Sequence, residues 1–378
     1  MILDLLASIF REPGECVIKV GSSGEEITSL YPFVKELTVD CSRSEPSQAN
    51  LKFETRRDEN GKWIVQDSGI LAPWEPIVIE AVFGSTTEEI MRGYIREINA
   101  DCPAEAGECT VTVKCQDESL QLDREHPRTT WGQDAPTSDS VIINTILSNY
   151  SLSPAPDNES GQDELVINQD DTDIKFLQQR AEANGYDLMF REGSVYFGPM
   201  RVDAEAQATI MVYAGTATNC YNISIKDDGH QPDSVSFDRP NTTEPGNVPA
   251  TIESDLTELG TDSTLGLGDG LKDFSWRMKQ QGGMSEAEWT ARAQRKANEL
   301  AMKVKAQGEL DGSLYGHVLR AGEPVGVDGV GERYGGIYLV DTVKHLFNMD
   351  GYRQTFTLLR NAYGDNLESS GDLLSAVL

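Results

Sequence analysis

The sequence predicts a mainly β protein in which one β module occurs twice, with an α+β segment inserted between the two copies. Short apolar runs at regular spacing, separated by polar or glycine-containing turns, fill both ends of the chain, as is typical of small barrels and sandwiches. The two ends also share strand order and spacing. Glu75-Pro76 matches Glu323-Pro324, and Arg92-Gly93-Tyr94 matches Gly335-Gly336-Ile337, which indicates an internal repeat.

The composition excludes several classes of partner. The chain has 378 residues, enough for two to four compact domains. Its 32 basic and 62 acidic residues give a net charge of -30. General affinity for DNA phosphates or anionic lipid needs clustered cations, so we expect neither DNA affinity nor stable membrane association. No stretch approaches transmembrane length, and we therefore expect the protein to be cytosolic when made.

The first part of the chain is predicted to be antiparallel β. Residues 1–14 begin with the apolar run MILDLLASIF, which we interpret as an arm that packs on the protein or on a neighbour. Residues 15–125 contain short strands in the runs CVIKV, ELTVDC, LKFET, PIVIEAVF, GYIREIN and CTVTVKC. In the last run the apolar Val111, Val113 and Cys115 alternate with polar residues, as in a half-buried strand.

An inserted α+β domain is predicted over residues 126–200. The run TSDSVIINTILSNY has the pattern of a helix with one apolar side. A second helix should carry Ile174, Leu177 and Ala181 on one face and end at Gly185, because glycine favours the left-handed conformation that ends helices. A strand hairpin follows it. The expected N-terminal caps are Thr137 or Ser138 for the first helix and Thr172 or Asp171 for the second.

Residues 201–284 are predicted to be a β segment followed by a connector. The runs ATIMVYAG, NISIKD and DSVSFD indicate strands. Residues 241–284 are rich in Gly, Thr, Asp and Pro and have little apolar content. We therefore expect an extended or mobile connection there.

Residues 285–364 are predicted to form a long helix and the second β region. Ser285 and Glu288 have the spacing of a capping box, which opens a helix over about residues 286–306. The apolar face of this helix runs from Trp289 to Val304. Strands follow in EPVGVDG, GGIYLVDTVKHLF and YRQTFTLLRN, and residues 365–378 form a C-terminal tail.

The cysteines do not indicate a metal site. Cys16, Cys41 and Cys115 fall on the apolar register of predicted strands, where free cysteine acts as a small hydrophobe. Cys102 and Cys109 bracket a loop, and a disulfide between them is an alternative to free thiols. There is no C-x-x-C motif and no Cys/His cluster, so we expect no zinc.

The search for catalytic and cofactor-binding motifs identifies no site residues. Hydrolase, metalloprotease, phosphate-loop and kinase motifs are absent from the sequence. Asp170, Asp171 and Asp173 lie together, but capping and the helix dipole explain carboxylates at a helix start, and the calcium-loop spacing is missing. The glycines of GVDGVGERYGG precede a strand, which favours hairpin turns. The histidines lie far apart in sequence, at His126, His230, His317 and His345; we interpret His345 as a packed or surface imidazole.

The helix pattern "Q…TD…FL…RA…GY", followed by a hairpin that ends in "FGP", resembles the inserted domain of the phage late control protein D family. These proteins are the baseplate hubs of contractile tails and are related to the N-terminal part of type VI secretion VgrG spike proteins. The C-terminal run from GEPVGVDG to NAYG resembles the closing barrel of the family, including Tyr338-Leu339-Val340, His345 and Tyr352. The resemblance covers about residues 15–364.

The resemblance implies two similar tube-like antiparallel β-barrels per chain, at residues 15–125 and 285–364, plus the inserted α+β domain. It implies a homotrimeric ring that joins the sixfold tail tube to the threefold central spike and lines the DNA channel. The implied partners are two further copies, a spike expected to be a separate chain, the tube or tube-initiator protein, and baseplate wedge proteins. Genomic DNA would only pass through. The implied location is the virion tail baseplate, after assembly in the host cytoplasm, and neither enzyme activity nor a cofactor is implied.

Other functions stay open beside this one. A tail-associated peptidoglycan-degrading enzyme would need a pair of catalytic carboxylates, which the sequence does not assign. A hub of a phage-tail-like contractile injection system would have the same fold. A carbohydrate-binding β protein is a third alternative, which the aromatic content of 7% disfavours.

The repeat and the charge lead to three further expectations. Two similar modules in each of three chains would give six positions around a ring, with module edges paired between neighbours. Strand positions that face the channel should be acidic or neutral, since cations would bind phosphate. Residues 366–378, which end in Leu373, Leu374, Val377 and Leu378, should act as a docking arm.

Overall fold

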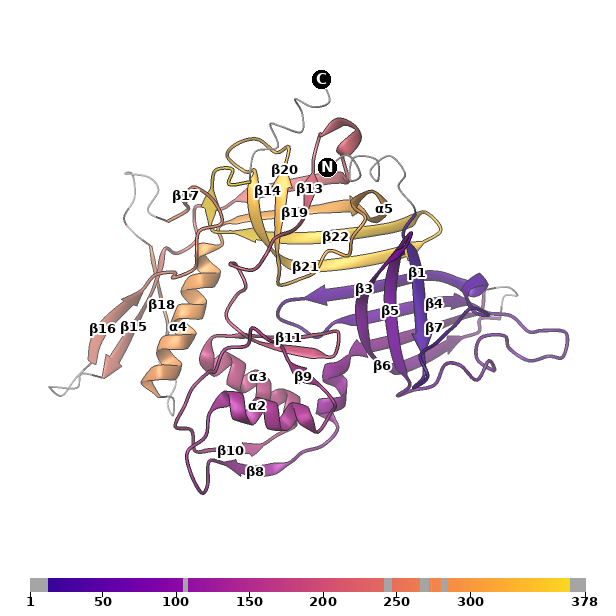
Figure 1. The fold of residues 1–378 in the computed structure, drawn as a ribbon, viewed down its shortest axis with the longest axis horizontal. Helices are drawn as coiled ribbons and strands as arrows, with labels where there is room; N and C mark the ends of the chain where they lie inside the picture. Colours follow the sequence, from indigo (N-terminus) through magenta and orange to yellow (C-terminus); the bar gives the residue numbers. More distant parts are fainter. Residues whose placement is uncertain are drawn as a thin grey trace.

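In the computed structural model most strands lie in one large sheet, with an α+β insertion on one side of it and a small helix-backed sheet beside it (Figure 1). The structure describes residues 13–104, 108–240, 247–265, 272, 274–279 and 285–367. The arm at residues 1–12 and the end of the tail from residue 368 therefore lie outside the described residues. No helix among the described residues is long and apolar enough to cross a membrane.

The large sheet contains two sets of strands, which are called the first and the second half below. The first half is β1 (Glu15–Val20), β2 (Glu25–Glu26), β3 (Val34–Ser42), β4 (Gln48–Glu54), β5 (Pro76–Phe83), β6 (Thr86–Asp101) and β7 (Thr110–Asp117). The second half is β13 (Gln207–Met211), β14 (Cys220–Asp227), β19 (Val304–Asp311), β20 (Pro324–Asp328), β21 (Gly336–Asn348) and β22 (Gly351–Arg360). Apart from β19, the sequence predicted a strand in each of the second-half positions.

The two halves have the same strand order. It runs β3-β4-β7-β6-β5-β1 in the first half and β14-β19-β22-β21-β20-β13 in the second, which is one and the same permutation of chain order. The copies differ at one end, because β1 is antiparallel to β5 whereas β13 is parallel to β20. The shared order confirms that one β module occurs twice.

The match extends to the register of single residues. Pro76 pairs with Tyr94, and Pro324 pairs with Leu339. The Glu-Pro match made from the sequence is therefore correct, but Tyr94 corresponds to Leu339 rather than to Ile337. The sequence alignment of this strand was wrong by two residues, because it aligned a glycine of each strand and the pairing partners decide otherwise.

Two β-bulges occur at matching places in both halves. One lies between Ile95 and Glu97 on β6 and between Val340 and Thr342 on β21. The other lies between Val34 and Glu36 on β3 and between Cys220 and Asn222 on β14. Bulges break the ladder at defined points, so their shared positions are evidence for the repeat that does not depend on side-chain identity.

Each half has a hydrophobic core on one face of the sheet, and Val318, Phe347 and Tyr352 of the second half pack into the core of the first. The first core includes Leu51, Phe53, Ile79 and Val113, and the second includes Ala306, Tyr338, Phe356 and Leu358. The hydrogen-bonded path through the described strands is open, with β14 at one end and β2 at the other. Closure of either half into a barrel therefore stays a prediction.

The insertion has a separate core between two helices and short sheets. Its elements are η2 (Glu118–Asp123), β8 (Arg128–Trp131), α2 (Asp139–Ser148), β9 (Ser153–Pro154), β10 (Ile167–Asp170), α3 (Asp173–Asn184), β11 (Asp187–Arg191) and β12 (Ser194–Gly198). Ser138 caps α2, Thr172 is the N-cap position of α3, and Gly185 ends α3 with a φ of 71°. Both predicted helices and the hairpin after them are confirmed.

The helix predicted over residues 286–306 is shorter than expected. Helix α4 covers Glu286–Ala301 and begins with the predicted capping box. Val304 instead begins β19, which pairs with β14 and β22. The inward positions of β19 include Ala306 and Gly308, and a side chain on Gly308 would meet the ring of Phe356. Residues 304–311 alternate apolar or small residues with polar ones, as a strand does, but the helix prediction extended over the first of them and hid this pattern.

The connector predicted at residues 241–284 contains strands in its described parts. β16 (Asn247–Ile252) and β18 (Ser275–Arg277) flank β15 (Ser234–Pro240) in a three-stranded sheet. This sheet packs on α4 through Val235, Phe237, Ala293 and Ala297. β17 (Asp262–Ser263) pairs with β23 (Ala362–Tyr363). Of the predicted extended or mobile connection, the described parts are extended backbone that pairs in sheets. Pairing and the apolar face of α4 order a segment with few apolar residues of its own. The remaining elements are η1 (Tyr31–Phe33), η3 (Gly215–Ala217) and α5 (Gly312–Tyr315).

Candidate functional site at the junction of the two halves and the insertion

The two halves join where β3 pairs antiparallel with β21, a pairing called the seam below. Ser42 lies opposite Thr342 at one end of the seam, and Glu36 lies opposite Asn348 at the other. Val39 is fully buried in the seam. The seam makes one continuous sheet from two modules, so their relative orientation is fixed by backbone hydrogen bonds.

His345 is a packing residue of the seam. It lies opposite Val39 and is 1% exposed. Its Nδ1 is 2.8 Å from the hydroxyl of Tyr352. Burial lowers the pKa of His345 to about 3, so the ring is neutral at physiological pH. Of the two interpretations of His345, a packed or a surface imidazole, the structure supports the packed one.

A buried ion pair attaches the insertion to the seam. Arg43 follows β3 directly, and its Nη1 lies 2.8 Å from each carboxylate oxygen of Asp187, the first residue of β11. The side chains of Arg43 and Asp187 are 7% and 3% exposed. Asp341 on β21 and Arg295 on α4 lie 3.5 Å from Arg43 and 3.3 Å from Asp187, respectively. Four elements therefore meet at one group of charges.

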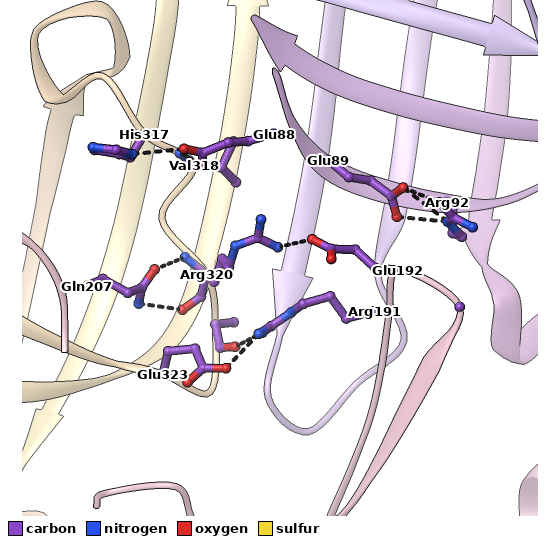
Figure 2. Close-up of polar contacts among 12 residues, drawn as sticks. Glu88, Glu89, Arg92, Arg191, Glu192, Gln207, His317, Val318, Arg320 and Glu323 are labelled. Atoms are coloured by element: carbon purple, nitrogen blue, oxygen red, sulfur yellow. Dashed lines mark hydrogen bonds and ion pairs between the residues drawn. The ribbon is translucent and has the colours of Figure 1, made fainter. Parts of the chain in front are cut away.

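A second set of ion pairs ties the insertion hairpin to the second half (Figure 2). Arg191 donates to Glu323 at 2.6 Å and to the carbonyl oxygen of Ala321 at 2.7 Å. Arg201 also donates to Glu323. Arg320 donates to Glu192 at 2.9 Å. Glu323, which precedes the repeated strand β20, therefore binds two arginines. Its position in the sequence repeat did not indicate this role.

The third connection joins the two halves directly. Glu88 on β6 accepts hydrogen bonds from the ring of His317 and from the backbone of Val318, both at 2.8 Å (Figure 2). Burial raises the pKa of Glu88, but these hydrogen bonds outweigh it and leave that pKa below its ordinary value. The hydrogen bond with Glu88 raises the pKa of His317. The pair is therefore favoured in its ionised form.

A cavity of about 350 Å³ lies within this junction, lined by charged residues that include Arg43, Asp117, Arg191 and Arg320. Burial raises the pKa of Asp117 to about 6 and that of its neighbour Glu118 to about 7. Glu118 accepts a hydrogen bond from the backbone of Gly193 in the hairpin turn. The charges lining the cavity serve mainly to hold the three parts of the chain together.

The remaining residues considered in the sequence analysis lie apart from this junction. Asp170 contacts His126 and Arg128, whereas Asp173 accepts from Tyr150 and Gln169. His230 stacks on Phe274. Within the described ranges there is no group of three His, Cys, Asp or Glu side chains placed to hold a metal ion. Cys102 and Cys109 are free thiols in this structure, as are Cys16, Cys41, Cys115 and Cys220.

Comparison with known proteins identifies the family. The family described as the Alg8 N-terminal domain matches residues 14–348, and the chain belongs to this family. Its description differs from the late control protein D family expected from the sequence. No curated protein matches the chain in sequence.

Solved tail proteins have the same fold. The 43 kDa tail protein of prophage MuSo2 from Shewanella oneidensis superimposes with a TM-score of 0.63 at 13% identity, over 92% of this chain and 98% of that one. A tail protein from Neisseria meningitidis gives 0.59 at 12%, over 93% and 97%. An E. coli type VI secretion component, itself described as similar to the T4 tail proteins gp27 and gp5, gives 0.51 at 12%, over 89% and 77%. These identities show likeness of fold alone.

Removing the Arg43 side chain should destabilise the protein strongly. The variant Arg43→Ala leaves the buried carboxylate of Asp187 without its closest partner, which should lower the free energy of unfolding by about 3 kcal/mol. The matched control is Lys35→Ala, because Lys35 and Glu54 form a half-exposed pair that should contribute less than about 1 kcal/mol. Urea denaturation measures both, and equal losses would contradict a special role for the buried pair.

The variant Glu118→Gln should change how stability depends on pH. Because burial raises the pKa of Glu118 to about 7, the folded protein binds a proton that the unfolded chain has already released. Stability should therefore fall as pH rises from the ordinary carboxyl range to about 7. The variant should melt at a higher temperature than the wild type at pH 8 and at nearly the same temperature at pH 5. Glu25→Gln, on the exposed β2, is the control, and a variant that melts below the wild type at pH 8 would argue against this account.

Proposed function

We propose that this member of the Alg8 N-terminal domain family, which has the fold of solved tail proteins, is a structural baseplate hub of a contractile phage tail. In this proposal it is related in function to late control protein D hubs and has no enzyme activity. Three copies form a ring that joins the sixfold tail tube to the threefold spike. The hub of a phage-tail-like contractile injection system is the second candidate, because a type VI secretion component shares the fold.

The observation that carries this proposal is the residue-by-residue repeat. A part that joins a sixfold tube to a threefold spike needs six similar positions made by three chains. The two halves share strand order, register and bulges, so three copies would supply six such positions. The insertion and the sheet on α4 occur once per chain, which suits contacts that follow the threefold symmetry.

The charge on the exposed face of the sheet supports a channel wall. On the face opposite the two cores the side chains from β14 to β6 are mostly Thr, Ser, Asn, Gln and charged residues. With the bulge residues included, the cations of this face are Lys35, Lys52, Arg96, Lys114, Lys226, Lys305, Lys344 and Arg353, and the carboxylates are Glu36, Asp40, Glu54, Glu97, Asp101, Glu309 and Asp311. This face is thus close to neutral in a chain of net charge -30.

Several cations of this face are already paired with carboxylates across neighbouring strands. Lys114 lies 2.9 Å from Glu97 and Arg353 lies 2.8 Å from Glu309. Phosphates would find few free cations there, so passing DNA would not be retained. The spike, the tube or tube-initiator protein and the wedge proteins are the proposed partners at the two rims and the periphery of the ring.

The purified protein should be a trimer. Native mass spectrometry should give roughly 125 kDa, three times the chain mass of 41.5 kDa, and negative-stain images should show rings with six similar lobes. A protein that stays monomeric with and without its spike would refute the hub. Clearing of cell walls in zymograms would instead favour the peptidoglycan-degrading alternative.

Reversing the paired carboxylates of the exposed sheet face should create DNA affinity. The triple variant Asp40→Lys, Glu97→Lys and Glu309→Lys frees three cations and adds three more. It should bind duplex DNA with a steep dependence on salt, whereas the wild type should not bind at physiological salt. Fluorescence anisotropy at several salt concentrations measures this. A control variant with the exposed Glu25, Glu59 and Glu332 changed to lysine tests whether net charge alone is responsible, and equal affinity of the two variants would argue against the special role of this face.

A further inference from the structure

We propose that the free edge of β14 in one copy pairs antiparallel with residues 97–101 of β6 in a second copy, in the register that β3 adopts on β21. The inference rests on the proposed ring but makes a separate claim, namely which strand edges meet and in which register. It is argued from the seam, which is an interface between modules already present within each chain.

The seam supplies the pattern for one partner strand. β3 and β14 are equivalent strands, because each is the terminal strand of its half. β3 pairs with β4, and β14 pairs with β19, which is the equivalent of β4. Both carry a bulge at the same point. β3 pairs on its outer edge with β21. In the described part of the chain nothing pairs with the outer edge of β14.

The seam also supplies the pattern for the other partner. β21 pairs with β20 before its bulge and with β3 after it, on the same edge. β6 pairs with β5 before the matching bulge. After this bulge, residues 97–101 pair with β7 on one edge only, as far as the described residues go. Each chain therefore presents one strand without a neighbour and one matching vacant edge.

Burial differs between equivalent residues as a missing partner requires. Leu37 and Val39 on β3 are 1% and 0% exposed, whereas their equivalents Ile223 and Ile225 on β14 are only half-buried. The same holds on the facing strand. His345 and Phe347 on β21 are 1% and 9% exposed, whereas the equivalent Ala100 and Cys102 are exposed. These residues have equivalent positions in the repeat and differ only in whether a partner strand lies beside them. A neighbouring strand would therefore bury the more exposed residues on β14 and at the end of β6.

The side chains fit when the seam register is transferred to the two free edges. Val39 lies opposite His345 in the seam, so Ile225 would lie opposite Ala100, and Ile223 would lie opposite Cys102. Both contacts are apolar and fall on the core side of the sheet. On the other side Lys226 would lie opposite Asn99.

Lys226 would also have carboxylates on both diagonals. In the transferred register these are Glu97 and Asp101, which lie within reach of a lysine. An unpaired strand edge invites pairing with another chain, and here the two edges are complementary. Because the two edges are different surfaces, the association runs head to tail, and it forms a ring when the rotation per copy closes.

Cysteine cross-linking between two differently labelled chains tests the register. One chain carries Ser224→Cys and the other Asp101→Cys, in a background with Cys102→Ala and Cys109→Ala. Cys16, Cys41, Cys115 and Cys220 remain, and burial raises the pKa of each of these thiols, so they should react slowly. A short bismaleimide should join the two chains into a product of twice the chain mass. Ser224→Cys mixed with Thr251→Cys, on the exposed edge of β16, should give no such product.

A blocking variant tests the same edge in another way. Ile225→Glu places a charge against Ala100 in the transferred register and should abolish assembly at concentrations where the wild type is fully trimeric. Thr251→Glu, on the edge of the other sheet, should assemble as the wild type does. Circular dichroism and melting of the monomer show whether the Ile225 variant is folded. If it is not, the cross-link alone decides.

The outcomes separate this inference from the proposed function. Trimers that form without the Ser224–Asp101 cross-link would overturn the edge assignment and leave the hub intact. A cross-link only within single chains, seen when both cysteines are placed in one chain, would also overturn it. A protein that neither assembles nor cross-links would overturn the ring and the edge assignment together.

Discussion

The pairing of β3 with β21 is the constraint on which the rest of the structure depends. It joins strands about 300 positions apart in the sequence, from Glu36 to Asn348, and turns two modules into one sheet. Each module has a core, and Phe347 and Tyr352 of the second module pack into the core of the first, so the seam is reinforced by apolar packing as well as by backbone hydrogen bonds. It also places Arg43, at the end of β3, beside Asp341 of β21, and this is where the insertion attaches.

The insertion is held by charges because its position must be specific. An apolar contact would tolerate sliding, whereas Nη1 of Arg43 must lie within hydrogen-bond distance of both carboxylate oxygens of Asp187. Buried pairs of this kind add little net stability, since desolvation offsets their attraction. They are costly to break, however, and the arginines that converge on Glu323 add a second fixed point. A domain held at two such points cannot rotate freely against the sheet.

The sequence predicted the features of the fold that depend only on residues close together in the chain. The caps of α2 and α3, the glycine at the end of α3 and the strands with clear alternation follow from neighbours within a few residues. The repeat was found because Glu-Pro begins the same strand in both copies. The alternation of β19 was in the sequence as well, but it was missed because the helix prediction ran past Ala301 and the inward residues Ala306 and Gly308 are only weakly apolar. Nor could it assign β16 and β18, which flank the predicted strand β15, or the partner of Arg43, since these depend on residues distant in sequence.

The seam has a geometric consequence for any assembly of this chain. The seam uses the outer edge of β3 and the edge of β21 after its bulge. Among the described residues, the equivalent edges of the other two strands, the outer edge of β14 and the edge of β6 after its bulge, stay unpaired. Adding a copy head to tail satisfies one pair and creates another, so an open chain of copies never runs out of unpaired edges. Only a closed ring does. If each junction between copies repeats the seam, the rotation per module is the same all around, and the number of copies is fixed by how far one seam turns the sheet. The intrachain seam would then determine the size of the ring, because it is the one junction whose geometry a single chain already contains.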